Sequence, residues 1–384
     1  MDILTFPPDY WDGPRHNRHY FCEELSKQHK VLFASPPFYL VDLLRKYGKG
    51  LLPNSGVNYV NENLMTYIPP KFLFTNYRFP NLNNKLRDMR VNRIKKLMHK
   101  HSMQKPILLM WHPVFNDMID YFEDSLLVYY IYDNLSGYVG SDPSKEYEAE
   151  VELIKRADIT FALSKELYDK NKKYSKNIHL LPNAVNYDLF KQSRDDATTV
   201  PSELADIPGP RIGYIGTINE KVDLNILECI AEERPEWSVV LIGRDNYQTE
   251  EKQRFEEFLK RKNVFRFGYK EYSTIPSYIK GLDALLMCYV INDWTFYGDP
   301  SKMHEYLASG KPTIATALPA MKEFEHVIDI PEAPEAWVDA IEKGLNEKDD
   351  EMKKIRIEVA QQNSYENRAK RATQIINDAI LKKA

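Results

Sequence analysis

The sequence IPGPRIGYIG at residues 207–216 marks the point where one pattern of strands and helices ends and a second begins. Its Pro-Gly-Pro closes a polar stretch, residues 191–209, that has the composition of a linker. Residues 212–215 then form an apolar run of strand length. Gly213 and Gly216 are small enough for a tight strand–turn–helix junction, where backbone amides can approach a phosphate. We therefore expect a second domain to begin directly after the linker.

Short apolar runs alternate with helical patterns on both sides of this point. Before the linker, the predicted strands are 3–6, 31–34, 65–68, 107–111, 126–132, 159–163 and 178–181, and the clearest helices are 16–27, 82–101 and 146–156. After it, the predicted strands are 212–215, 238–242, 264–267, 284–289, 313–315 and 327–328. Runs that are apolar on both faces suit parallel sheets covered by helices on each side. The fold class is therefore α/β, with two Rossmann-like domains.

The predicted organisation is an N-terminal domain of residues 1–190, the linker of residues 191–209, a C-terminal domain of residues 210–362, and a helix of residues 363–384 that crosses back to the N-terminal domain. Ligands of such sheets bind at the carboxyl ends of the strands, so we expect the site in a cleft between the two domains.

Composition narrows the functional classes. The 384 residues are 43% hydrophobic and 28% charged, which is typical of a globular protein, and the net charge of -4 argues against nucleic acid as the main partner. The sequence shows neither a signal peptide nor an apolar run of the ~18–20 residues that span a bilayer. Three widely spaced cysteines match neither a disulfide framework nor a zinc site. We expect a cytoplasmic protein.

The most informative segment is GDPSKMHEYLASGKPT at residues 298–313. Pro300 suits the start of a helix, and the Gly-Lys-Pro at its end suits a stop. The helix N-terminus, with Ser301 and Lys302, would favour a phosphate. Glu305 lies one turn further on, where its carboxylate can accept hydrogen bonds from a ribose diol. The alternative is an ordinary capped helix with Glu305 on its solvated face.

This segment resembles the donor-binding motif of the family-4 retaining glycosyltransferases, which have the GT-B fold, and is closest to the branch of bacterial surface-polysaccharide and teichuronic-acid-type enzymes. Other motifs follow in the order that the family uses: ADIT at 157–160, LPNAVN at 181–186, GYIGTINEK at 213–221, LIGR at 241–244, and Asn263-Val264 followed by Gly268. The similarity runs from about residue 130 to residue 319.

The resemblance implies a set of donor-binding residues: Gly216, Thr217, Lys221, Gly243, Arg244, Ser301, Lys302 and Glu305. It implies a nucleotide-sugar donor, with UDP- or GDP-sugars favoured, and neither a cofactor nor a metal, in keeping with the lack of a DxD triplet. For Gly216 the alternative is tight strand packing, and for Arg244 it is a surface ion pair rather than a bidentate diphosphate clamp.

This chain departs from the family pattern at several positions. Tyr297 stands where the first of two glutamates is usual, so either Asp293 or Asp299 substitutes for it or the sugar is held differently. The 181–186 motif has Ala and Asn in place of Gly and Asp, and Thr217 replaces an arginine.

Two polar residues follow buried strands in the first domain. His112 and Asp133 are the candidate catalytic residues, because a histidine there can hydrogen-bond the sugar or take the acceptor proton. The alternatives are a helix cap for His112 and a loop contact for Asp133. Gly13, Arg15 and His16 resemble the family's first loop, on the acceptor side; a capped helix is the alternative.

Residues 71–101 contain nine Lys or Arg and one acid, Asp88. Aromatic and apolar residues lie beside or upstream of them: Phe38, Tyr39, Leu40, Leu43, Leu44, Phe72, Phe74, Tyr77 and Phe79. This pattern favours peripheral contact with an anionic membrane, at the inner face. A solvated helix face is the alternative; RNA binding would need similar residues, but no RNA module is recognisable.

The expected function is transfer of a sugar from a nucleoside-diphosphate donor to the hydroxyl of a lipid-linked or oligosaccharide acceptor, with retention of configuration. Two other functions stay open: a nucleotide-sugar 2-epimerase of the same fold, and a non-catalytic nucleotide-sugar-binding scaffold.

Overall fold

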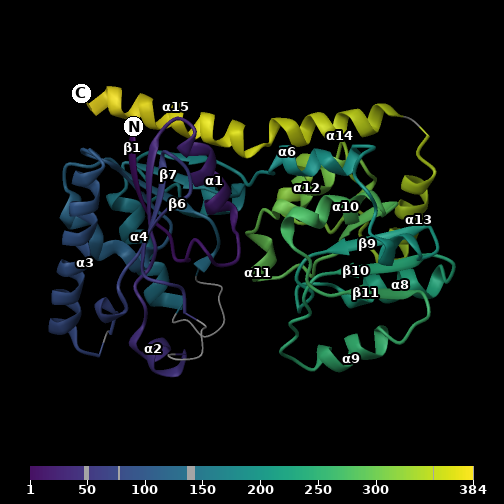
Figure 1. The fold of residues 1–384 in the computed structure, drawn as a ribbon. Helices are drawn as coiled ribbons and strands as arrows, with labels where there is room; N and C mark the ends of the chain where they lie inside the picture. The colour runs from purple at the N-terminus through teal and green to yellow at the C-terminus, as the bar shows by residue number, and fades with distance from the viewer. Residues whose placement is uncertain (47–51, 77, 136–142, 349, 384) are drawn as a thin grey trace. The chain divides into compact units, whose positions relative to one another are not determined.

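The structure is a computed structural model that describes residues 1–46, 52–76, 78–135, 143–348 and 350–383. The chain forms two compact units (Figure 1). The first comprises Met1–Pro182 together with Glu366–Ala384, and the second comprises Asn183–Tyr365. The segment expected as a linker, residues 191–209, lies inside the second unit.

The first unit is built on one mixed sheet. Its described strands are β1 (Asp2–Phe6), β2 (Lys30–Ala34), β3 (Gly56–Tyr59), β4 (Leu64–Ile68), β5 (Ile107–Met110), β6 (Leu127–Ile131), β7 (Ile159–Ala162) and β8 (Ile178–Leu180). They lie in the order β3-β4-β2-β1-β5-β6-β7-β8. All neighbours are parallel except β3 and β4. The central strands are buried along almost their whole length, as strands covered on both faces must be.

Helices and 3₁₀ turns connect these strands. They are α1 (Asn17–Ser26), α2 (Leu40–Lys46), η1 (Lys71–Leu73), α3 (Pro80–Lys100), η2 (Pro113–Phe122), α4 (Pro143–Arg156) and α5 (Lys165–Asn171). From residue 366 on, α15 (Tyr365–Lys383) also belongs to this unit. It buries Ala369, Ala372 and Ile376, and its Thr373 hydroxyl lies 3.2 Å from Nε2 of His29.

The second unit has a parallel sheet of five described strands, ordered β11-β10-β9-β12-β13. They are β9 (Arg211–Ile215), β10 (Ser238–Ile242), β11 (Val264–Phe267), β12 (Ala284–Met287) and β13 (Thr313–Ala315). The helical segments are α6 (Tyr187–Phe190), η4 (Lys191–Arg194), α7 (Ser202–Ala205), α8 (Leu224–Glu233), α9 (Glu251–Phe258), η5 (Tyr272–Thr274), α10 (Ile275–Lys280), α11 (Asp293–Phe296), α12 (Ser301–Ser309), η6 (Pro319–Phe324), α13 (Pro334–Leu345) and α14 (Asp350–Gln362).

The α/β class and the two-sheet architecture predicted from sequence are confirmed, with two corrections. The first sheet is not wholly parallel, because β3 forms an antiparallel edge on β4. Residues 327 and 328 do not form a strand. They follow η6, where Val327 and Ile328 donate their backbone N–H groups to Phe324, and only Asp329 pairs with Ile314.

The chain enters and leaves the second unit at neighbouring points. Val185 pairs with Ser364 in a parallel bridge, the Val185 N–H donates to Asn363, and Tyr365 donates back to Val185. Two segments that are far apart in sequence are therefore tied together where the chain crosses between the units.

Candidate functional site

The donor-side candidates cluster around the N-terminus of α12. The helix runs from Ser301 to Ser309, with Pro300 before it and Gly310 after it, as the sequence predicted. Tyr306, on this helix, is buried and accepts from the Ile215 N–H at 3.0 Å through its hydroxyl. The first turn of α12 is thereby held beside the carboxyl end of β9, where its unpaired N–H groups can meet an anion.

Two glycines make room for this arrangement. Gly216 has φ +148° and Gly243 has φ +146°, which favour glycine, and a Cβ on Gly243 would stand 1.9 Å from the Gly216 carbonyl oxygen. A Cβ on Gly216 would stand 2.0 Å from Cε of Lys302 and 2.7 Å from its Nζ. The Lys302 ammonium group therefore lies directly over the glycine backbone.

Lys221 converges on the same place. Its Nζ lies 5.3 Å from the ring centre of Tyr289 and 5.8 Å from that of Trp294. Burial raises the pKa of Tyr289, but the charges of Lys302 and Lys221 outweigh burial and lower that pKa below its ordinary value. Both lysines thus lower the pKa of the same buried hydroxyl. Gly216 and Lys302, two of the residues predicted to bind the donor, are in contact, and Lys221 lies beside Tyr289, which sequence reasoning missed.

Glu305 is buried rather than solvated, which contradicts the alternative of an ordinary exposed helix face. Its Oε1 accepts a 2.8 Å hydrogen bond from the hydroxyl of Tyr272. Burial raises the pKa of Glu305, opposed by Lys302 and by the Tyr272 hydrogen bond. The carboxylate is thus oriented by a residue that the sequence did not single out.

Arg244 and Thr217 are exposed. The guanidinium of Arg244 lies over the ring of Tyr269, 4.4 Å from its centre. Thr217 uses its backbone, because its carbonyl accepts from the Tyr214 hydroxyl at 2.9 Å. Ser301 is half-buried as the first residue of α12.

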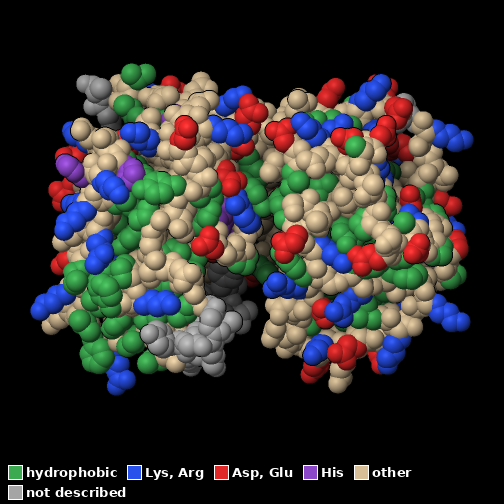
Figure 2. Space-filling model, viewed as in Figure 1, with side chains coloured by type: hydrophobic (Ala, Val, Ile, Leu, Met, Phe, Trp, Pro, Cys, Tyr) green, Lys and Arg blue, Asp and Glu red, His purple; other side chains and the backbone are tan. Residues whose placement is uncertain are grey.

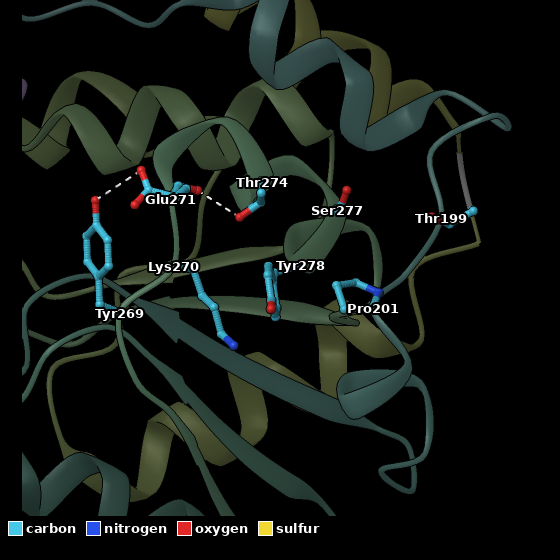
Figure 3. A pocket seen from close by; sticks show the side chains of 8 residues that line it. All are labelled: Thr199, Pro201, Tyr269, Lys270, Glu271, Thr274, Ser277 and Tyr278. Carbon is cyan, nitrogen blue, oxygen red and sulfur yellow. Dashed lines mark hydrogen bonds between the residues drawn. The ribbon is translucent and has the colours of Figure 1, made fainter.

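A depression of about 440 Å³ lies in the second unit, beside the loop that follows β11 (Figure 3). Tyr269 and Lys270 come from the loop, Thr274 and Tyr278 from η5 and α10, and the sides are completed by Thr199, Pro201, Glu271 and Ser277. Its lysine is already engaged, because Lys270 forms a 2.6 Å ion pair with Glu203.

Asp299 does not replace the missing glutamate. It is buried, its Oδ2 accepts from the Asn183 N–H at 2.7 Å, and its backbone oxygen accepts from Asn183 Nδ2 at 2.8 Å. Asp293 is exposed in the first turn of α11, and Tyr297 follows that helix.

In the first unit, a cavity of about 250 Å³ opens at the carboxyl ends of β1, β2, β4 and β5. His112 lines it, together with Phe6, Tyr10 and Ser35. Nδ1 of His112 accepts from the Val114 N–H at 3.1 Å, so the neutral ring carries its proton on Nε2. Burial, and then the charge of Arg18, lower the pKa of His112 to about 4, against the effect of Asp9. His112 thus caps η2 and also offers a neutral N–H donor, rather than a base, through its second nitrogen.

The buried Arg18 and the half-buried Asp9 form an ion pair near His112. The Arg18 Nε donates to Asp9 Oδ2, and its guanidinium lies 4.6 Å from the ring centre of Tyr132. His16 lies beside this pair, with Nε2 3.9 Å from Asp9 Oδ1. Burial, and then Arg18, lower the pKa of His16. Sequence reasoning missed both members of the pair, because nothing in a single chain marks an arginine as buried.

The other first-unit candidates have local partners. Arg15 forms a 2.6 Å ion pair with Glu23 and lies over the rings of Trp11 and Tyr20. The Gly13 N–H closes a turn onto Tyr10. Asp133 is half-buried, and its Oδ1 accepts from the Asn134 N–H at 2.8 Å. These contacts do not gather Arg15 and Asp133 around His112.

The surface predicted around residues 71–101 carries exposed apolar side chains. Four side chains on α2, η1 and the residues before α3 are more than half exposed: Val41 55%, Leu44 76%, Phe72 57% and Phe79 54%. Figure 2 shows hydrophobic side chains gathered at this end of the first unit. Phe38 and Leu43, which were expected at the surface, instead pack in a small core with Ile68 and Phe74. Tyr77 lies outside the described residues.

Several of the nine cations in this segment contact other side chains, among them Arg93 over the ring of Phe72 and Lys95 over the ring of Phe122. Arg87 pairs with Asp117 at 2.5 Å, and the buried Arg90 donates to the carbonyls of Leu73 and Phe74. Across the described part of the chain, no helix combines the length and the apolar character that crossing a membrane requires. Within the same residues, no group of three or more His, Cys, Asp or Glu side chains is arranged to hold a metal ion.

Comparisons with known proteins bear on these findings. Residues 209–347 match the family described as Glycosyl transferases group 1. Over 214 residues, or 53% of this chain, the sequence is 31% identical to the putative teichuronic acid biosynthesis glycosyltransferase TuaH of Bacillus subtilis (strain 168). The match spans 52% of that protein, so the chain aligns with about half the length of its curated relative.

Solved structures show the fold. Sucrose-phosphate synthase from Thermosynechococcus elongatus superposes with a TM-score of 0.69 at 15% identity over 99% of both chains. Anabaena HepE in complex with UDP and glucose gives 0.66 at 14% identity over 98% of this chain and 99% of its own. A glycosyltransferase from Rickettsia africae gives 0.67 at 17% identity over 100% and 99%. The chain has the GT-B fold, and most of its second unit matches the Glycosyl transferases group 1 family.

Proposed function

We propose that the protein is a glycosyltransferase that moves a sugar from a nucleoside-diphosphate donor to a hydroxyl acceptor in surface-polysaccharide or glycoconjugate biosynthesis. One observation carries the proposal: Lys302 lies over the backbone of Gly216 at the N-terminus of α12, and Lys221 lies beside Tyr289, whose pKa both lysines lower. This constellation lies inside the region that matches the group 1 family. The leaving diphosphate gains negative charge in the transition state, and two ammonium groups and helix amides stabilise it.

The proposed donor is a UDP- or GDP-sugar. A structural relative of this chain binds UDP and glucose, which favours UDP. Glu305, oriented by Tyr272, is placed one turn along α12 from the proposed diphosphate site and would accept hydrogen bonds from the ribose hydroxyls. We propose that the two lysines and the helix N-terminus serve in place of a metal, and that no cofactor takes part.

The proposed stereochemical course is retention, with the departing phosphate assisting attack from the same face. The similarity to the group 1 family supports this course. On the first unit, His112 would donate its Nε2 hydrogen to a sugar or acceptor oxygen, because its lowered pKa keeps the ring neutral. Arg15, His16 and Asp133 remain the other candidates on the acceptor side.

The proposed location is cytoplasmic, with peripheral binding to an anionic inner membrane surface through residues 71–101. The exposed Leu44, Phe72 and Phe79 beside the basic α3 support this contact, since apolar and cationic side chains together favour an anionic interface. Such a surface would bring the enzyme to a lipid-linked acceptor.

A nucleotide screen tests the donor site. UDP, GDP, ADP, dTDP and CDP are each titrated by calorimetry, and thermal unfolding is followed with each one present. We expect selective binding of one nucleotide, which at 100 times its Kd stabilises the fold by ~2.7 kcal/mol. If none binds at millimolar concentration, the donor-site assignment is wrong. Sugar release from the matching donor that depends on an added acceptor would separate transfer from epimerisation.

A further inference from the structure

Asp299 joins two parts of the second unit that have different roles. It directly precedes Pro300 and the first turn of α12, which carries Lys302. Its side chain accepts from the backbone N–H of Asn183, and the side chain of Asn183 donates to its backbone oxygen, at 2.7 and 2.8 Å. The two residues are 116 positions apart and bind each other reciprocally, side chain to backbone in both directions.

Asn183 is the first residue of the second unit. Two residues later, Val185 exchanges backbone hydrogen bonds with residues 363 and 365, where the chain leaves the unit. Asp299 therefore links the start of α12 to residues 183–185, the segment by which the chain enters the second unit and which is itself hydrogen-bonded to residues 363–365.

The burial of Asp299 strengthens its hydrogen bonds with Asn183. The residue is only 5% exposed, so water competes little for its oxygens. Its Oδ1 lies 3.7 Å from Nε2 of His304, which is itself fully buried against the ring of Phe324. The carboxylate is thus enclosed between Asn183 and α12, with its side chain only 4% exposed.

We propose that Asp299 is a positioning residue, which holds the anion-binding first turn of α12 in place by anchoring it to the crossing segment at Asn183. The expected effect, that Asp299 influences donor binding without touching the donor, rests on the proposed function. The anchor itself is a property of the fold and can be measured without nucleotide.

The first test uses nucleotide affinity. For the nucleoside diphosphate that the wild type binds, we expect Asp299→Ala to raise the Kd about tenfold. Asp299→Asn should stay within about threefold, because an amide oxygen can still accept from the Asn183 N–H. Asn183→Ala removes only the bond from the Asn183 side chain, so its Kd should lie between those of the two Asp299 variants. Asn183→Ala also replaces Asp299→Ala as the test if that variant does not fold.

Asp283→Ala is the control for the loss of a carboxylate that accepts a backbone N–H. Asp283 Oδ2 also accepts a backbone N–H at 2.7 Å, from Arg211, but at the opposite end of β9. Asp283→Ala should leave the Kd unchanged. Equal losses in Asp283→Ala and Asp299→Ala, or an unchanged Kd in Asp299→Ala, would overturn the proposal.

The second test separates this proposal from the proposed function. Hydrogen–deuterium exchange of the amides of residues 303–306, which are hydrogen-bonded within the first two turns of α12, is measured without nucleotide. Asp299→Ala should speed exchange there at least tenfold, and Asp283→Ala should not. Unchanged exchange in Asp299→Ala refutes the anchor whatever the nucleotide data show. Faster exchange in a protein whose wild type binds no nucleotide would leave the anchor standing and refute the donor site.

Discussion

The side chain of Lys302 lies over the backbone of Gly216, so close that a single added methyl group would stand 2.0 Å from Cε of the lysine. The contact joins the end of β9 to the first turn of α12. It also explains why the residue after β9 has to lack a side chain.

Substituting Gly216 by alanine should therefore harm both stability and binding. The backbone there has φ +148°, so a Cβ adds strain of about 1–3 kcal/mol in addition to the clash with Lys302. We expect chemical denaturation to show that loss and calorimetry to show weakened nucleotide binding. Gly268→Ala is the control, because a Cβ at Gly268 meets nothing within 4 Å. A Gly216→Ala protein as stable as that control would contradict the close approach.

Lys302→Ala should weaken binding of the preferred nucleoside diphosphate about tenfold, because it removes one of two cations at the proposed diphosphate site. Its Kd should also depend less on salt than that of the wild type. Lys252→Ala removes the same charge from the exposed side of α9 and should change neither quantity. Titrations at two ionic strengths measure both effects. Equal affinities for wild type and Lys302→Ala would remove Lys302 from the site.

Glu305→Gln should abolish the preference for ribose over 2′-deoxyribose. A carboxylate accepts hydrogen bonds from both ribose hydroxyls, whereas an amide of the same shape accepts fewer. We expect the wild type to bind the ribonucleotide more tightly than its 2′-deoxy form, and the variant to bind both alike. Tyr272→Phe, which removes the 2.8 Å hydrogen bond to Glu305, should reduce the preference in part. A variant that keeps the full preference would place the ribose elsewhere.

Stability should fall as pH drops from about 6.5 to about 4. Burial lowers the pKa values of His112 and His19 to about 4, so between these limits the unfolded chain binds more protons than the folded one. The full free energy of unfolding is therefore present above pH 6.5. At pH 5, each of the two histidines lowers the free energy of unfolding by up to about 2 kcal/mol. Denaturation at pH 7 and pH 5 measures the loss. His112→Gln should remove its own share, and an unchanged pH dependence would show that His112 titrates normally.

Leu44→Asp should reduce binding to vesicles that contain anionic lipid. Leu44 is 76% exposed beside the basic α3, so burying it in an interface gains apolar contact, and an aspartate there would be repelled. Leu381 of α15 is equally exposed, and Leu381→Asp is the matched control. Sedimentation with vesicles of zero and 30% anionic lipid, roughly the range over which surface charge changes binding, separates the two. Binding that neither substitution changes would exclude this patch.

The strands and the ends of α12 could be predicted because their causes are local. Apolar runs such as 238–242 are buried on both faces, and Pro300 and Gly310 bracket one helix. The edge strand β3 could not be predicted from the sequence, because its residues are mostly exposed and carry no apolar pattern. Residues 327 and 328 were misassigned because they are apolar and buried in the core, which periodicity cannot distinguish from a strand.

The site was predictable only where a motif marked it. Lys302 and Glu305 stand in such a motif, but their partners Tyr289 and Tyr272 lie elsewhere in the chain. The pairing of Asp299 with Asn183, and of Arg18 with Asp9, depends on how the chain returns upon itself. The prediction that Phe38 and Leu43 lie at the surface was wrong for the same reason, because both side chains pack against Ile68 of β4.

The first unit is discontinuous, and this has a consequence for biosynthesis. On the ribosome its sheet emerges first, but the helical segment that buries Ala369, Ala372 and Ile376 emerges only after the whole second unit has been made. During synthesis of the second unit, the first unit therefore keeps exposed the apolar face that residues 366–384 later cover. Such a delay exposes a surface that chaperones recognise, and a ribosome that stalls before residue 366 would leave a product with one finished half and one unfinished half.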